Sequence, residues 1–123
     1  MSARSLLIVS IVIFLSSNAY GGDGTGNTYK LGCRLLAADI PVPADKIEAV
    51  KVGECSGAVD AIFVLRRALD PSIRFCPPPR VAPGQKVRIV AKYLDDHPEQ
   101  MNDDFTLLVV RAFDQVWPCP NTN

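Results

Sequence analysis

The 123-residue sequence has no excess of charge of either sign. Lys and Arg together number 13, Asp and Glu also number 13, and there is one histidine. Nucleic acids and anionic membrane surfaces are bound by concentrated Lys and Arg, so this balance argues against both as partners.

Sequence motifs for catalysis and for ligand binding are also missing. The chain has no glycine-rich phosphate loop, no C-x-x-C pair and no D-x-D-x-D-G calcium loop. The single histidine, His97, stands in a turn directly before a proline, where its ordinary role is to shape a corner between helices. The cysteines are expected to be oxidised, which removes the thiolate that a Cys/His nucleophile requires. We therefore predict that the protein is not an enzyme and that it binds no cofactor and no metal ion.

What is present begins with a charged and then apolar N-terminal segment. Arg4 precedes the run Leu6–Leu15, and the small residues Ser17 and Ala19 fit positions −3 and −1 of a cleavage site. The apolar run is far shorter than the roughly 20 residues of a membrane-spanning helix. We therefore predict that residues 1–19 are a cleavable signal peptide, with export of the rest of the chain and no stable membrane insertion.

Four cysteines follow this segment, at Cys33, Cys55, Cys76 and Cys119. An even number of cysteines in an exported chain indicates two disulfides, for which three pairings exist. A zinc site is the competing interpretation, but it would require closely spaced cysteine pairs, and the spacings in this chain are wide.

The rest of the chain is expected to be one all-α domain. Residues 20–27 are rich in glycine and are predicted to form a flexible leader. Over residues 28–123, apolar residues recur mostly at spacings of three to five, which favours helices, although each Val/Ile-rich run taken alone also fits a buried strand. The pattern predicts four helices, at 28–39, 45–70, 84–95 and from Pro98 or Asp103 to Val116, with an extended proline connector at 75–79. Pro83 suits the first position of the third helix.

Two glycines interrupt the longest predicted helix. Gly53 and Gly57 each lower helix propensity by about 1 kcal/mol relative to alanine. They indicate either that the helix starts later, near Glu54, or that another helix packs closely at these positions.

Charged residues gather in two parts of the chain. Acidic residues surround His97 and form either a solvated corner, because helix N-termini favour acids, or a partner-binding surface. Basic residues concentrate in the middle of the chain, either by ordinary dispersal of charge or to steer a protein partner. The acidic residues are Asp95, Asp96, Glu99, Asp103 and Asp104, and the basic ones are Arg66, Arg67, Arg74, Arg80, Lys86 and Arg88.

Several short motifs follow one another in a characteristic order. A cysteine in the first helix precedes Cys55-Ser56-Gly57, which opens a long helix containing Asp60. The remaining motifs are Phe75-Cys76-x-Pro, Val-x-x-Gly-Gln at 81–85, Tyr93-Leu94-Asp95-Asp96-His97-Pro98, Ala112-Phe113 and Trp117-Pro118-Cys119-Pro120. From Cys33 to Pro120, this combination resembles the Rap/Tai family, immunity proteins that neutralise peptidoglycan amidase toxins delivered by type VI secretion.

The resemblance implies a small helical periplasmic protein, often a homodimer, that binds a cell-wall amidase toxin and obstructs its active-site groove. An inhibitor needs a rigid surface rather than catalytic groups, and disulfides limit the cost of ordering that surface on binding. Exposure and charge lead us to predict partner contacts first at the acidic corner and then on the proline connector, namely Asp95, Asp96, His97, Glu99 and Asp103, followed by Arg74 and Arg80.

For the disulfides we favour Cys33–Cys55, which would tie the first helix to the second, and Cys76–Cys119, which would tie the connector to the C-terminal end. The other pairings stay open, because a sequence alone does not decide connectivity.

A second functional hypothesis comes from a different class of protein. Small disulfide-linked helical proteins also serve as envelope stress proteins or acid-activated chaperones. That role predicts that low pH exposes apolar surface for client binding, which an immunity protein does not require.

Overall fold

The computed structural model describes residues 23–38 and 45–121. This part of the chain forms the helices α2 (Gly26–Ala37), α3 (Lys46–Leu65), α4 (Pro83–Asp96) and α5 (Phe105–Val116), with short 3₁₀ turns η2 (Arg66–Ala68), η3 (Pro71–Ile73) and η4 (Pro98–Gln100). The described residues contain no β-strand, only two isolated bridges, so the predicted all-α fold is confirmed. The expected signal peptide, residues 1–19, lies outside the described residues.

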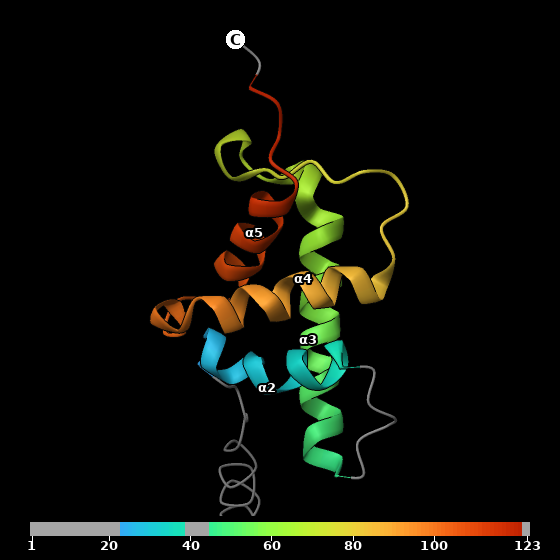
Figure 1. Ribbon diagram of the computed structural model, residues 1–123, viewed down its shortest axis with the longest axis vertical. Coiled ribbons are helices and arrows are strands. Elements are labelled where there is room, and N and C mark those ends of the chain that lie inside the picture. The colour runs from blue at the N-terminus through green and yellow to red at the C-terminus, as the bar shows by residue number, and fades with distance from the viewer. Residues whose placement is uncertain (1–22, 39–44, 122–123) are drawn as a thin grey trace, which may run out of the picture.

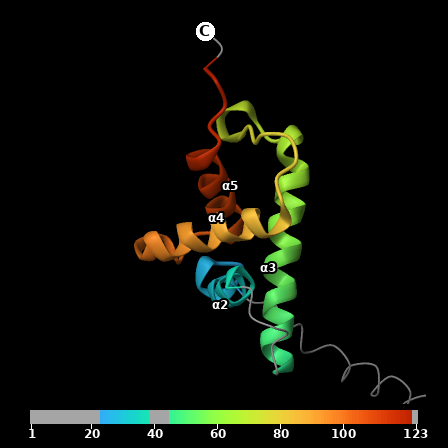
Figure 2. The same ribbon diagram turned by 45° about the vertical axis from the view of Figure 1, so that its right-hand side comes forward.

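The helices pack against one side of the long helix α3. Helices α2 and α4 run across α3, and α5 lies beside its C-terminal half (Figure 1). All three lie on the same side of α3 (Figure 2). The fully buried side chains between them are Cys33, Cys55, Val59, Phe75, Val90, Leu94, Phe105, Leu108, Val109 and Phe113. Within the described ranges, no helix combines the length and the apolar character that crossing a membrane requires.

Helix α3 starts at the earlier of the two predicted positions. Asp45 caps it, because its carboxylate accepts a hydrogen bond from the backbone N–H of Ile47 at 2.9 Å. The alternative start near Glu54 is therefore wrong. The α-helix ends at Leu65, sooner than the predicted residue 70, and continues as the turn η2.

Helix α2 begins at Gly26, two residues before the predicted start. The N–H groups of Gly26 and Asn27 donate to the backbone oxygens of Asp103 and Met101, at 3.1 and 3.0 Å. The carbonyl of Gly24 accepts from the N–H of Phe105 at 2.8 Å. The later part of the predicted flexible leader (residues 20–27), from residue 23 onward, is therefore part of the folded domain. Residues 20–22 lie outside the described ranges.

Helix α4 begins at Pro83, as predicted, but no side chain caps its N-terminus. The preceding residue, Ala82, has the extended backbone of an N-cap and offers no hydrogen-bond acceptor on its side chain. The third helical residue is Gln85, whose side chain has the right chemistry for a capping box with a serine or threonine at position 82.

We expect Ala82→Ser to stabilise the domain by about 1 kcal/mol, because the new hydroxyl satisfies an N–H group of the first turn. Urea denaturation of the oxidised protein measures the change. In the A82S background, Gln85→Ala should remove part of the gain. No gain in A82S would show that solvent already satisfies the first turn equally well.

Both favoured disulfide pairings are confirmed. Cys33 is bonded to Cys55, which ties α2 to α3, and Cys76 is bonded to Cys119, which ties the connector to the segment after α5. Beside the second bond, the N–H of Cys76 donates to the backbone oxygen of Trp117 at 2.8 Å. The start of the connector and the end of the domain are thus held together covalently and by a backbone hydrogen bond.

Helices α3 and α4 are also joined by a charged contact. The ammonium group of Lys86, a residue only 9% exposed, donates to the carboxylate of Asp60. It also lies 4.7 Å from the ring centroid of Phe63, a cation–π distance. A nearly buried lysine is stabilised in this way by one carboxylate and one aromatic ring.

Candidate partner-binding site

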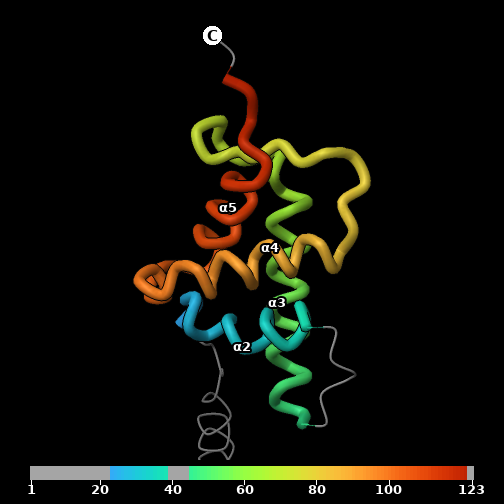
Figure 3. The backbone as a smooth tube through the Cα atoms, in the orientation of Figure 1, coloured from blue at the N-terminus to red at the C-terminus, as the bar shows by residue number. Residues whose placement is uncertain are grey.

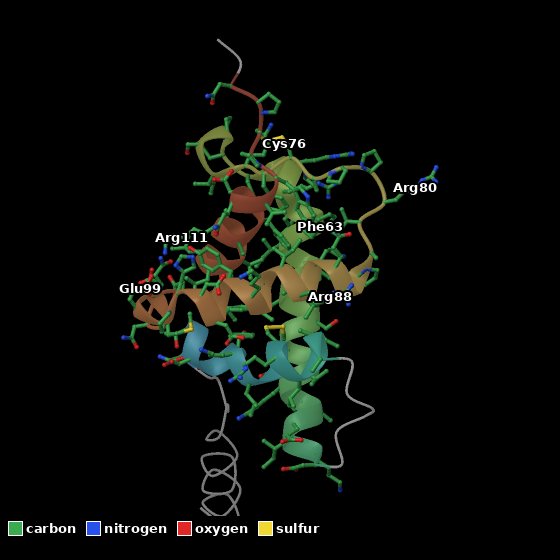
Figure 4. All side chains as sticks on the ribbon, viewed as in Figure 1. Phe63, Cys76, Arg80, Arg88, Glu99 and Arg111 are labelled. Atoms are coloured by element: carbon green, nitrogen blue, oxygen red, sulfur yellow. A yellow bond between two sulfur atoms is a disulfide. The ribbon has the colours of Figure 1, made fainter. Side chains whose placement is uncertain are left out.

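The predicted contact residues fall into two separate places. Asp95, Asp96, His97, Glu99 and Asp103 gather at the C-terminal end of α4, in and around η4, and we call this group the acidic corner. Arg74 and Arg80 lie on the segment between η3 and α4 instead. Figure 4 shows Glu99 and Arg80 at opposite sides of the molecule.

The aspartates of the acidic corner are paired with neighbouring lysine and arginine side chains. Asp95 lies 3.4 Å from the ammonium nitrogen of Lys30 on α2 and 3.6 Å from Nε of Arg34. The Asp96–Lys92 and Asp103–Arg111 pairs each have an N–O distance of 2.6 Å. These exposed ion pairs contribute at most about 1 kcal/mol each, but they leave little unpaired charge to attract a partner.

His97 packs in the corner rather than facing a nucleophile. Its ring centroid lies 4.2 Å from that of Tyr93, and its Nδ1 lies 3.2 Å from Oε1 of Glu99. The backbone N–H of Glu99 and this contact with His97 hold the pKa of the Glu99 carboxyl below its usual value. The hydroxyl of Tyr93 donates to Gln100 at 2.9 Å. This arrangement shapes the turn between α4 and η4.

No arrangement of metal ligands occurs in the described part of the chain. A group of three or more His, Cys, Asp or Glu side chains able to surround an ion is not found there. All four cysteines are in disulfides, so the described domain presents no free thiol.

Arg74 has a structural position at the base of the connector. Its Nη2 donates to the backbone oxygen of Leu69 at 2.9 Å, and its Nε is buried without a hydrogen-bond partner. The side chain thereby closes the loop that contains η3. Part of the Arg74 guanidinium is therefore already occupied by a contact within the domain.

Arg80 lies at the outer end of a projection that we call the connector arm, residues 76–82. Three consecutive prolines extend the arm from Cys76, and Figure 3 shows that it loops outward between η3 and α4. Arg80 has a φ of 63°, the left-handed region that non-glycine residues rarely adopt, and it is exposed. In Figure 4 its side chain points away from the rest of the domain.

Both ends of the connector arm are fixed to the domain. At one end are the Cys76–Cys119 disulfide and the neighbouring Phe75, whose buried ring lies 4.9 Å from that of Phe113. At the other end, Pro83 opens α4. The arm therefore presents an arginine from a preorganised backbone.

A third surface was not predicted from the sequence. It is a face of a helix that no other described helix covers. On α3, a Cβ added at Gly53 or Gly57 would meet nothing within 4 Å, and Val50 and Val64 are 61% and 71% exposed. The signal in the sequence is that α3 has apolar residues on all sides, a pattern typical of a helix covered on both faces. We define the α3 face as Ile47, Val50, Gly53, Gly57, Ala61, Val64 and Leu65, all exposed.

Comparison with protein families gives one assignment for the whole described domain. A family model described as Rap1a immunity proteins matches residues 25–119, well over half of the chain. Searches among curated proteins and among solved structures gave no match. The matched range includes both disulfides, the acidic corner, the connector arm and the α3 face. The chain belongs to the family of Rap1a immunity proteins.

Proposed function

We propose that this immunity protein acts in the periplasm, where it binds and inhibits a peptidoglycan amidase effector of type VI secretion. The match of residues 25–119 to the immunity family carries the proposal. Two disulfides support an oxidising compartment such as the periplasm. The amidase target rests on the resemblance of the ordered motifs between Cys33 and Pro120. Inhibition by occupation of a groove requires binding alone, so no catalysis is assigned to this chain.

The connector arm is the surface that best fits inhibition of an enzyme with a groove. It projects from the domain, and its ends are fixed by a disulfide and by the start of α4. Preorganisation of this kind lowers the cost of ordering a binding loop. Arginine is among the residues most often found to dominate interface energies. We therefore place the principal contact at Arg80, with Arg74 supporting the base of the arm.

The acidic corner is the second proposed contact region. A partner that binds Asp95, Asp96, His97, Glu99 or Asp103 has to compete with the ion pairs of the aspartates and with the His97–Glu99 contact already made inside the domain. Each pair is exposed, so changes at these positions should alter affinity by no more than about 1 kcal/mol each.

The first experiment measures binding and inhibition with purified components. The oxidised domain is titrated into type VI amidases by calorimetry, and peptidoglycan cleavage is followed in parallel. Tight binding with loss of cleavage supports the proposal. Failure to bind any amidase, together with capture of many unrelated proteins only at low pH, would favour the chaperone hypothesis.

We expect Arg80→Asn to raise the Kd for the amidase by about 10- to 100-fold. Asparagine tolerates the left-handed backbone, so this change removes the guanidinium while keeping the shape of the arm. Asp96→Asn is the matched control, because it removes one exposed charge at the corner and should change the Kd by less than about fivefold. The opposite ranking of the two variants would place the principal contact at the acidic corner.

The second partner we propose is another copy of this chain, docked through the α3 face. The face is self-complementary in an antiparallel arrangement. When Gly57 of one copy lies opposite Gly57 of the other, Val50 lies opposite Val64 and Gly53 lies opposite Ala61. Small residues at the crossing allow two helices to approach closely, and the valines on either side provide apolar contact.

We expect Gly57→Arg to convert a dimer into a monomer, because a long charged side chain blocks the crossing point. Sedimentation equilibrium of the oxidised protein measures this. Arginine is a better helix former than glycine, by about 1 kcal/mol, so the variant should keep its fold. Gln115→Arg, which adds the same charge at an exposed position of α5, should remain dimeric. A wild-type protein that is monomeric at high concentration would contradict this arrangement.

A further inference from the structure

The two disulfides differ in their access to solvent. Cys33 and Cys55 are both 0% exposed and lie between α2 and α3 in the core. Cys76 is exposed and Cys119 is partly exposed. A reagent can therefore reach the second bond in the folded protein, whereas the first requires the helices to separate.

The exposed disulfide lies in a surface cavity. Cys76 and Cys119 both line a space of about 300 Å³, together with Pro71, Arg74 and Pro120. A neighbouring space of about 510 Å³ shares Cys119 and Arg74 with it and adds Asp114 from α5. Cys119 therefore lines both spaces, and Cys76 lines the smaller one.

A basic residue, Arg74, lines the cavity. A guanidinium favours the approach of a thiolate and stabilises the thiolate that leaves a disulfide. Arg74 lines both spaces, and its backbone oxygen lies 3.4 Å from Sγ of Cys119. Asp114, which lines only the larger space, has the opposite effect, because its carboxylate repels an approaching thiolate.

We propose that Cys76–Cys119 is a thiol–disulfide exchange site for dithiols, one that operates without unfolding of the domain. One thiolate of the dithiol attacks Sγ of Cys119, the bond to Cys76 breaks, and Cys76 leaves as a thiolate that takes a proton from water. The second thiol of the reagent loses its proton to water and attacks the reagent's own sulfur in the mixed disulfide, which releases Cys119 as a thiolate that takes up a proton. The reagent gives up two electrons and becomes a disulfide, and the protein gains two thiols.

The consequence concerns the connector arm. After exchange, the covalent bond at the base of the arm is gone, while the N–H of Cys76 and the buried ring of Phe75 still hold that region to the domain. The fold persists and the arm becomes less ordered. If the proposed function is correct, affinity for the amidase falls on exchange by about 10-fold, because the arm must be ordered again on binding.

The test uses dithiothreitol on the folded, oxidised protein. Samples are taken over time, free thiols are alkylated, and peptide mapping identifies which cysteines have reacted. Cys76 and Cys119 should react at least about 100-fold faster than Cys33 and Cys55, since the buried bond waits for a costly opening of the core. Circular dichroism should show that the one-disulfide species keeps its helices. Equal rates for all four cysteines, or loss of helix with the first bond broken, would overturn the proposal.

Charge variants separate an exchange site from simple exposure. Arg74→Gln should slow exchange at Cys119, and Asp114→Asn should accelerate it, with the Cys33–Cys55 rate unchanged in both. If the exchange rate at Cys119 changes in the same direction in both variants, the experiment measures only loosening of the structure. That result would contradict the role of the cavity. If the oxidised protein binds no amidase, the proposed function is contradicted. The faster reaction of Cys76–Cys119 than of Cys33–Cys55 with dithiothreitol would still test the exchange site by itself.

Discussion

Replacing Gly32 with alanine is expected to destabilise the domain by about 3 kcal/mol or more. A Cβ at this position would lie 2.0 Å from the backbone oxygen of Lys51 and 2.5 Å from its carbonyl carbon. Both atoms belong to the backbone of α3, so no side chain can rotate to make room. Helix α2 must move away from α3, although the Cys33–Cys55 bond beside the contact holds the two helices together.

Urea denaturation of the oxidised variant measures this effect, and Gly53→Ala is its matched control. A Cβ at Gly53 would meet nothing within 4 Å in the same chain, so at a concentration where the protein is monomeric alanine there should stabilise the helix by about 1 kcal/mol. The same chemical change is thus expected to have opposite signs at two glycines of neighbouring helices. A Gly32→Ala protein as stable as the parent would contradict the close approach of α2 and α3.

Removal of the buried disulfide is the second change with a large expected effect. The double variant Cys33→Ala, Cys55→Ala should lose about 3–5 kcal/mol of stability. Loop closure accounts for part of this loss. The rest comes from the space left where two fully buried sulfur atoms were packed against the core.

The double variant Cys76→Ala, Cys119→Ala distinguishes the two contributions. Its bond spans 43 residues, against 22 for Cys33–Cys55, so loop closure alone predicts a slightly larger loss for it. Because this bond is near the surface, little core packing is lost with it. We expect a loss of about 2–3 kcal/mol, smaller than for the buried pair. The reverse order in denaturant titrations would show that chain entropy outweighs packing in this domain.

Helix positions were predictable where a local signal marks them. Pro83 has its φ already set for a helix, and apolar residues then recur to Leu94, so the start of α4 was located correctly. The start of α2 depends instead on hydrogen bonds from Gly26 and Asn27 to residues near the other end of the chain. No local pattern contains that information.

The glycines show why packing was harder to predict than helix content. Gly53 and Gly57 were considered as places for close packing because they interrupt an apolar segment. Among the glycines that the structure describes, the close approach to another backbone occurs at Gly32, where a Cβ would meet the backbone of Lys51. Sequence identifies a small residue but does not say which face of the helix it occupies.

The predicted contact residues were only partly grouped by the sequence. Those of the acidic corner are close together because they are close in the chain. Arg74 and Arg80 were added to the predicted contacts because they are charged, yet their positions depend on the connector. The residue type does not predict the left-handed backbone of Arg80. The contacts themselves stay a prediction until binding is measured.

The hydrogen bonds between the two ends of the domain have a consequence for the order in which the chain assembles. Asn27 is joined to Asn102, 75 positions later, and Gly24 and Gly26 are bonded to Phe105 and Asp103. Contacts of such long range form late in folding, because a large loop has to close first. During N-to-C-terminal synthesis, the first turn of α2 has no partner for these groups until the start of α5 has emerged. The domain is therefore expected to complete its folding only after almost the whole chain is available.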